Sequence, residues 1–93
     1  MASYELTIIL PGDTGAAKVK TFTQTLGKNV TTAKGRVVKS DEWGKIALTY
    51  PIKKNETGFF LHFELELEGA EVKNLTNRFK LDDDIIRYLL VKK

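Results

Sequence analysis

The strongest constraint on the fold is a pair of alternating apolar runs that meet across a polar turn. The first run places Ile46, Leu48, Tyr50 and Ile52 on one side of an extended chain, with Lys45, Ala47 and Thr49 on the other. The second run places Phe59, Leu61, Phe63, Leu65 and Leu67 opposite Phe60, His62, Glu64 and Glu66. Because a period of two is typical of half-buried strands, the region predicts a long hairpin that turns through the polar segment 53–58.

The remaining elements follow from the same reading of apolar spacing. Alternation over 4–10 predicts a first strand. Apolar residues spaced by three and four predict helices over about 15–33 and 70–80. A last strand is expected over 85–91.

The extended region 36–52 is too long for one regular strand. Its segment Asp41-Glu42-Trp43-Gly44 joins polar residues to a glycine, so we expect a bulge or a sharp bend there. Gly35 follows the first predicted helix and is expected to adopt the left-handed conformation that ends many helices.

The order strand, helix, strand, strand, helix, strand predicts an α+β protein with the ferredoxin-like fold. In this fold a four-stranded antiparallel sheet carries both helices on one face. With 93 residues in all, we expect 1–93 to form a single domain. The other sheet face stays uncovered, and on the first three strands its expected residues are Glu5, Thr7, Ile9, Lys45, Ala47, Thr49, Phe60 and His62.

The last predicted strand does not alternate. Over 85–91 the sequence reads IIRYLLV, so large apolar side chains remain exposed whichever face is turned to the core. A contiguous apolar strip beside Phe60 favours a partner surface over scattered surface hydrophobes. The expected partner-binding residues of this strand are Arg87, Leu89 and Val91, with Lys92 at the charged rim.

Composition excludes several classes of function. The chain has no Cys, which excludes disulfides and thiol nucleophiles, and its single histidine, His62, excludes a two-His metal site. Asp82-Asp83-Asp84 lacks the spacing of a calcium loop and predicts a solvated turn. No apolar run approaches the roughly 20 residues of a membrane span, and the N-terminus has no signal-peptide layout. We therefore expect a cytoplasmic protein with no cofactor, no membrane contact and no small-molecule substrate.

Lysines gather around the predicted hairpin. Lys39, Lys45, Lys53 and Lys54 form the clearest basic cluster, in a chain with a net charge of +3 and a pI of about 9.2. Such a cluster can bind phosphate or can simply keep a surface solvated, and charge alone does not separate the two.

Two other functions stay open on the residues alone. One is a single-stranded RNA binder of the RNA-recognition-motif type, which would use Phe60 with His62 two residues further on. Its motif needs two aromatic residues on the open face, where strand parity places only Phe60. The other is a small enzyme of the acylphosphatase type, which is disfavoured because the loop 11–15 has no basic residue for a phosphate.

Four short motifs carry a resemblance to a known family. They are Tyr4-Glu5, Glu42-Trp43-Gly44, Tyr50-Pro51-Ile52 and Gly58-Phe59-Phe60. Together, with compatible spacing from Tyr4 to Lys93, they resemble the sixth protein of the bacterial small ribosomal subunit. The resemblance implies a non-catalytic structural protein of the small ribosomal subunit in the cytoplasm.

The resemblance also implies two partners. In that family the protein forms a heterodimer with the eighteenth small-subunit protein on the central domain of the small-subunit ribosomal RNA. By this resemblance, the residues expected to contact RNA are Lys39, Lys45, Lys53, Lys54 and His62. The residues expected to contact the partner protein are Phe60, Arg87, Leu89, Val91 and Lys92.

Overall fold

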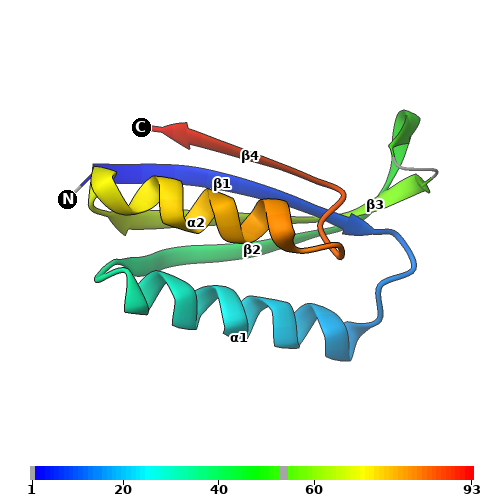
Figure 1. The fold of residues 1–93 in the computed structure, drawn as a ribbon. Helices are drawn as coiled ribbons and strands as arrows, with labels where there is room; N and C mark the ends of the chain where they lie inside the picture. The colour runs from blue at the N-terminus through cyan, green and yellow to red at the C-terminus, as the bar shows by residue number, and fades with distance from the viewer. Residues whose placement is uncertain (1, 53–54) are drawn as a thin grey trace.

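The computed structural model describes residues 2–52 and 55–93, which form four strands and two helices. The elements are β1 (Ala2–Pro11), α1 (Ala16–Thr32), β2 (Arg36–Ile52), β3 (Asn55–Leu67), α2 (Gly69–Leu81) and β4 (Arg87–Lys92). The strands form one antiparallel sheet in the order β2-β3-β1-β4, and both helices lie on the same face of it (Figure 1). The predicted α+β, ferredoxin-like fold is therefore confirmed.

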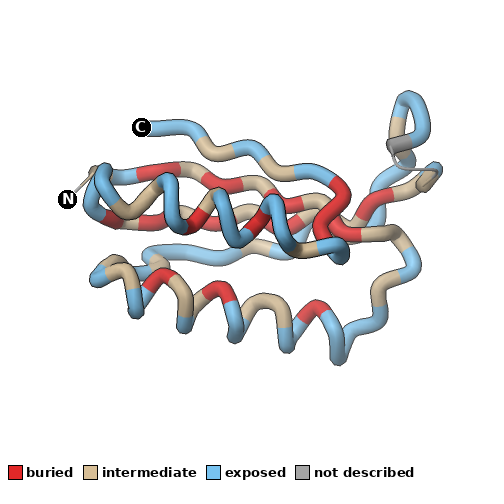
Figure 2. Tube along the Cα trace, in the orientation of Figure 1, coloured by how far each residue is buried: buried red, intermediate tan, exposed pale blue. Residues whose placement is uncertain are grey.

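Regular alternation along β1 and β3 builds the sheet side of the core. Over most of their length every second residue of these strands is buried, and the residues between them are half-exposed (Figure 2). The buried side chains that the helices add to this layer are Val19, Leu26 and Val30 of α1 and Leu75 and Phe79 of α2. Full burial of such a side chain contributes about 1.5–3 kcal/mol. Packing on the sheet therefore stabilises α1, whose threonines and Gly27 are poor helix formers.

Helix α1 ends with a left-handed lysine. Lys34 has a φ of 61°, and the N–H groups of Lys34 and Gly35 donate to the carbonyls of Thr31 and Val30. The expectation that Gly35 would take this conformation was wrong. Gly35 is needed for space instead, because a Cβ atom there would lie 2.4 Å from the carbonyl oxygen of Glu66 on β3.

Strand β2 is interrupted by bulges, as its length predicted. Its pairing with β3 shifts between Val37 and Lys39 and again between Glu42 and Gly44, where Gly44 has a φ of 85°. The expected bend at 41–44 is confirmed. Because each bulge adds one residue, each reverses the alternation of faces: Lys39 and Asp41 pair with open-face residues of β3, and after Trp43 the even-numbered residues do so again.

The pairing beyond the bulge overturns one expectation about faces. Lys45 and Ala47 pair with Phe59 and Thr57, so they do not share the face of Phe60. Ile46 pairs with Gly58 and takes that place. Thr49 lies in a further irregularity between Ala47 and Ile52. The prediction failed because it turned the apolar side of the run 46–52 to the core, whereas Ile46 and Tyr50 are exposed in this part of the hairpin.

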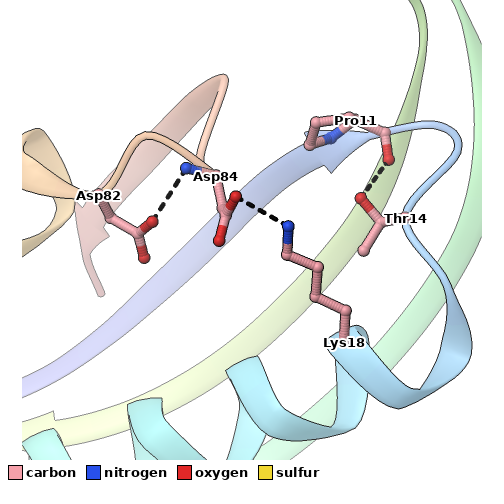
Figure 3. Close-up of polar contacts among 5 residues, drawn as sticks. All are labelled: Pro11, Thr14, Lys18, Asp82 and Asp84. Atoms are coloured by element: carbon pink, nitrogen blue, oxygen red, sulfur yellow. Dashed lines mark hydrogen bonds and ion pairs between the residues drawn. The ribbon is translucent and has the colours of Figure 1, made fainter.

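The connection from α2 to β4 is held to the start of α1. The Asp84 N–H donates to Oδ1 of Asp82 at 2.9 Å, and Lys18 Nζ lies 2.9 Å from Asp84 Oδ1 (Figure 3). The acidic run 82–84 is thus a turn stabilised by the Asp82 side chain, as the sequence predicted. In the neighbouring loop before α1, Thr14 donates its hydroxyl proton to the Pro11 carbonyl at 2.6 Å.

Candidate partner and nucleic-acid surfaces

The open face, defined as the sheet face opposite the helices, carries side chains in rows set by strand register. Thr7 lies between His62 and Leu89, Ile9 between Phe60 and Arg87, and Glu5 between Glu64 and Val91. Residues directly opposite one another in antiparallel strands share a face and lie close enough for their side chains to interact. Phe60, Arg87, Leu89 and Val91 therefore share one surface, as the sequence predicted.

Leu89 and Val91, which we call the apolar strip, are the exposed hydrophobic residues of β4. Leu89 is 61% exposed and Val91 is 48% exposed. Their neighbours Tyr88 and Leu90 pack against the core on the other face. The strand itself therefore alternates normally. The apparent failure of alternation came from Ile85 and Ile86, which are buried in the connection before β4 begins.

A second apolar group lies where the hairpin leaves the sheet. A Cβ atom built on Gly58 would lie 2.6 Å from Ile9, 3.2 Å from Phe60 and 3.5 Å from Leu48. These three side chains therefore converge over a glycine that leaves room for them. Strand parity had placed Leu48 on the opposite face from Phe60, so its part in this group was missed.

The stacked pair Trp43 and His62 joins edge strand β2 to β3 on the open face. Their ring centroids are 4.9 Å apart and their planes are 9° from parallel. The His62 Nδ1 atom lies 3.2 Å from the Thr7 hydroxyl oxygen, which makes a hydrogen bond. Trp43 is still 52% exposed. The sequence contains one tryptophan, and sequence analysis placed it in the expected bend at 41–44 but not among the site residues. It was missed because a bulge residue has no fixed face in an alternating pattern.

Charged residues surround these apolar groups. Lys93 Nζ lies 3.3 Å from Glu64 Oε1 and 3.9 Å from Glu5 Oε1. At another edge, Arg36 forms an ion pair with Glu66. These side chains are partly exposed, so each pair adds little to stability but keeps the rim of the open face polar.

The basic arm is defined as Lys39, Lys45, Lys53 and Lys54, and its two described members lie on opposite faces of the hairpin. Lys39 pairs with Glu64 on the open face, and its Nζ lies 3.7 Å from Asp41 Oδ2. Lys45 is exposed on the other face and forms no ion pair within the described part of the chain. Lys53 and Lys54 lie outside the described residues.

Two residues do not lie with the residues they were expected to act with: Lys92 with the partner-binding residues of β4, and His62 with the RNA-binding lysines. Lys92 pairs with Tyr4, a core residue, so it lies on the helix side of β4 and can reach a partner only around the strand edge. His62 lies among the open-face residues, where Trp43 stacks on it and Thr7 bonds to it, and not beside Lys45.

Residues 2–52 and 55–93 carry neither of two further kinds of site. No three His, Asp or Glu side chains of these ranges gather as metal ligands. Neither α1 nor α2, the helices of the described chain, is long and apolar enough to cross a membrane. The open face combines apolar, aromatic and charged groups, which suits macromolecular contact better than chemistry on a small molecule.

Comparison with known proteins gives consistent results. A family model for ribosomal protein S6 matches residues 3–92. The small ribosomal subunit protein bS6 of Pelagibacter ubique is 36% identical over 92 residues, covering 99% of this chain and 76% of that protein. The bS6 protein of Magnetococcus marinus is 34% identical and is covered to 64% of its length. The chain thus spans about two thirds to three quarters of these relatives.

Solved structures show the same fold. The crystal structure of 30S ribosomal protein S6 from Thermotoga maritima superposes with a TM-score of 0.92 at 20% identity, covering 99% of this chain and 87% of that one. The P2 domain of the chemotaxis kinase CheA from the same organism reaches a TM-score of 0.62 at 13% identity, so the fold alone does not select a function. The family match over nearly the whole sequence does: this chain belongs to the ribosomal protein S6 family, a family of structural, non-enzymatic proteins of the small ribosomal subunit.

Proposed function

We propose that this protein binds the small-subunit ribosomal RNA through the basic arm and binds ribosomal protein S18 through the open face. Family membership gives the protein its place on the small ribosomal subunit in the cytoplasm. The observation that carries the finer proposal is the apolar strip of β4, which lies on a sheet face that neither helix covers. A free protein gains nothing by exposing such a strip, so a partner is expected to cover it.

The open face has the anatomy of a protein-binding surface. Leu89 and Val91 form an apolar centre, and Trp43 adds the type of aromatic residue that dominates binding energy at interfaces. Glu5 and Glu64 with Lys93 supply a charged rim. Arg87 lies at the end of the apolar strip next to Ile9, and Lys92 contributes from the strand edge.

The basic arm suits contact with phosphate groups. Lys45 is exposed and lacks an ion-pair partner among the described residues, so its charge is available to RNA. Lysine binds phosphate as a point charge and reads no base sequence, so the arm positions the protein on RNA without specifying it. Trp43 covers one ring face of His62 and Thr7 bonds to its Nδ1, so the remaining ring atoms are the part of His62 that can contact RNA.

A second candidate function is favoured by the Trp43–His62 stack. Single-stranded RNA binders of the recognition-motif type stack bases on aromatic residues of an open sheet. The stack brings an aromatic ring to this face in addition to Phe60, which the sequence alone did not provide. If this function holds, changing Trp43→Ala will weaken RNA binding more than S18 binding.

The test of the proposed function uses the full chain, purified S18 and a fragment of the central domain of the small-subunit RNA. Changing Lys45, Lys53 and Lys54 together to Gln should lower RNA affinity. It should also flatten the plot of log affinity against log salt by about 0.7–0.9 for each phosphate that is no longer neutralised. Binding of S18, followed by titration calorimetry, should not change. A salt slope that stays constant while affinity falls would show that the arm does not act through phosphate.

A further inference from the structure

One stretch of this chain is basic without any acidic counterpart. Between Asp13 and Asp41 the sequence contains no Asp or Glu, and its basic residues are Lys18, Lys20, Lys28, Lys34, Arg36 and Lys39. This stretch forms α1 and the first part of β2. The positive charge of the molecule is therefore concentrated on one part of the fold, which is distinct from the turn of the hairpin.

Half of these charges are not neutralised by neighbours. Lys18, Arg36 and Lys39 form ion pairs with Asp84, Glu66 and Asp41. Lys20, Lys28 and Lys34 are exposed and form no ion pair with any residue of the described ranges. Their charge is therefore free to attract an anionic partner.

One of these free lysines, Lys28, lines a surface groove between α1 and β2. The groove has a volume of about 1030 Å³ and is lined by Gln24, Gly27, Lys28, Thr31, Thr32, Arg36 and Val37. Lys20, Gln24 and Lys28 are spaced by four residues and thus lie on one line along the helix. From Lys20 to Lys28 this line extends about 12 Å along the helix axis, at 1.5 Å per residue.

The groove offers cations and amides rather than hydroxyl donors. Thr31 and Thr32 already donate their hydroxyl protons to the carbonyls of Gly27 and Lys28, each at 2.9 Å. The remaining side-chain donors of the lining are the Lys28 ammonium group, the Gln24 amide and the N–H groups of Arg36 that do not donate to Glu66. At Gly27 no atom other than those of its neighbours and the local helix backbone lies within 4 Å of where a Cβ would stand, so this wall of the groove is open to a ligand.

We propose that this groove, which we call the α1 groove, binds the sugar-phosphate backbone of RNA. Its lining contains no aromatic side chain on which a base could stack, which argues against readout of bases. Val37 is the one large apolar residue of this lining, so a protein partner would find no apolar anchor there. Uncompensated lysines along a line fit regularly spaced phosphates.

The inference rests on the proposed binding of ribosomal RNA and adds a second contact to it. The connection from α1 to β2 lies at one end of the molecule, and the β2–β3 hairpin projects from the other end (Figure 1). The longest dimension of the molecule is 36 Å. A protein that holds RNA at both ends would bridge two segments of the RNA rather than attach to one.

The first experiment compares two charge-matched double variants. Lys20→Gln with Lys28→Gln removes two charges at the α1 groove, whereas Lys73→Gln with Lys80→Gln removes two exposed charges from α2. Binding of the full chain to the central-domain RNA fragment is measured across a salt series. The α1 variant should lower the log–log salt slope by about 0.7–0.9 for each phosphate left without its lysine, and the α2 variant should leave the slope near the original value. Equal slopes for the two variants would overturn the proposal.

A second experiment uses Gly27 to separate binding from folding. Gly27→Ala and Gly27→Glu both replace a helix glycine where there is room for a side chain, so both should raise the melting temperature. Only Gly27→Glu places a negative charge in the α1 groove, so only that variant should bind RNA more weakly. Equal RNA affinity of the two variants would contradict the proposal whatever their stability.

The outcomes also separate this inference from the proposed function. If the hairpin variant with Lys45, Lys53 and Lys54 changed shows a weaker salt dependence and the α1 variant does not, the α1 groove fails and the proposed function stands. If the α1 variant keeps its RNA binding but no longer binds S18, the α1 groove is a protein surface and the inference is wrong. If the unchanged chain does not bind the RNA fragment with or without S18, both are wrong.

Discussion

The indole of Trp43 and the imidazole of His62 stack across two neighbouring strands, with ring centroids 4.9 Å apart and planes 9° from parallel. Trp43 reaches this position because it is the extra residue of a β2 bulge, between Glu42 and Gly44 in the pairing with β3. Gly44, with its φ of 85°, lets the strand resume pairing immediately afterwards. The bulge therefore places an aromatic surface on the open face that regular alternation would not provide.

This stack should be measurable as a coupling between the two rings. Aromatic pairs typically contribute about 0.5–1.5 kcal/mol beyond the area they bury. A double-mutant cycle with Trp43→Ala and His62→Ala, read from urea unfolding, should give a coupling in that range. Purely additive effects of the two changes would show that the stack does not stabilise the isolated protein.

Adjacent leucines of β4 should respond in opposite ways to a charge. Leu89→Asp, on the open face, should leave the domain folded and abolish S18 binding, because the carboxylate would be buried only in the complex. Leu90→Asp should unfold the domain or lower its stability strongly, because Leu90 packs against the core. Circular dichroism melts and titration calorimetry of both variants would check this. Unfolding by Leu89→Asp would show that the two faces of β4 have been exchanged.

The helix–sheet contact should dominate stability. Leu26 and Leu75 are each 2% exposed, one on each helix. Truncation of either to Ala should cost about 2–5 kcal/mol, which is a large part of the stability of a small domain. Leu81→Ala is the control, since Leu81 is 84% exposed at the end of α2 and should shift the urea midpoint little. Equal shifts for Leu81→Ala and Leu26→Ala would mean that burial does not set the cost.

The end of α1 offers a stabilising substitution. Lys34 adopts a left-handed φ of 61°, which an L residue with a side chain adopts at a cost. Lys34→Gly should therefore stabilise the protein by about 0.5–1 kcal/mol, measured by urea unfolding. Gly35→Ala should do the opposite, because its Cβ would collide with the Glu66 carbonyl oxygen. A Lys34→Gly variant that is less stable would mean that the lysine side chain itself supports the turn.

The fold could be predicted because β1, β3 and both helices keep regular spacing over many residues. The same regularity correctly assigned Phe60 to the open face. Leu89 and Val91 were also expected there, although the run 85–91 as a whole does not alternate. Prediction failed beyond the bulge at Trp43: the apolar residues of the run 46–52 were expected to face the core, but Ile46 lies on the open face and Lys45 on the other. The location of a bulge can be anticipated from glycine and chain length, but whether it adds one residue or two depends on packing with the neighbouring strand.

The buried pair Ile85 and Ile86 illustrates a second limit. In the sequence these residues continue the apolar run of the last strand, but in the structure they close the core before β4 begins at Arg87. Apolar content alone does not distinguish a strand from a buried connection. The N–H of Ile86 donates to the Ile9 carbonyl at 2.9 Å, a long-range contact that no local pattern encodes.

Because β1 lies between β3 and β4, no local event can complete the sheet. Ala2 pairs with Leu67, and Tyr4 pairs with both Leu65 and Lys92, so the first strand must wait for segments from the second half of the chain. Closing loops of this length lowers the chain entropy before any stabilising contact forms. Domains rich in such distant contacts therefore fold more slowly than helical bundles. The β2–β3 hairpin is the one strand pair of the described sheet whose strands are consecutive in sequence, and it can form early. The folding rate should therefore be limited by the docking of β1 against this hairpin, and changes in β4, if it docks last, should mainly accelerate unfolding.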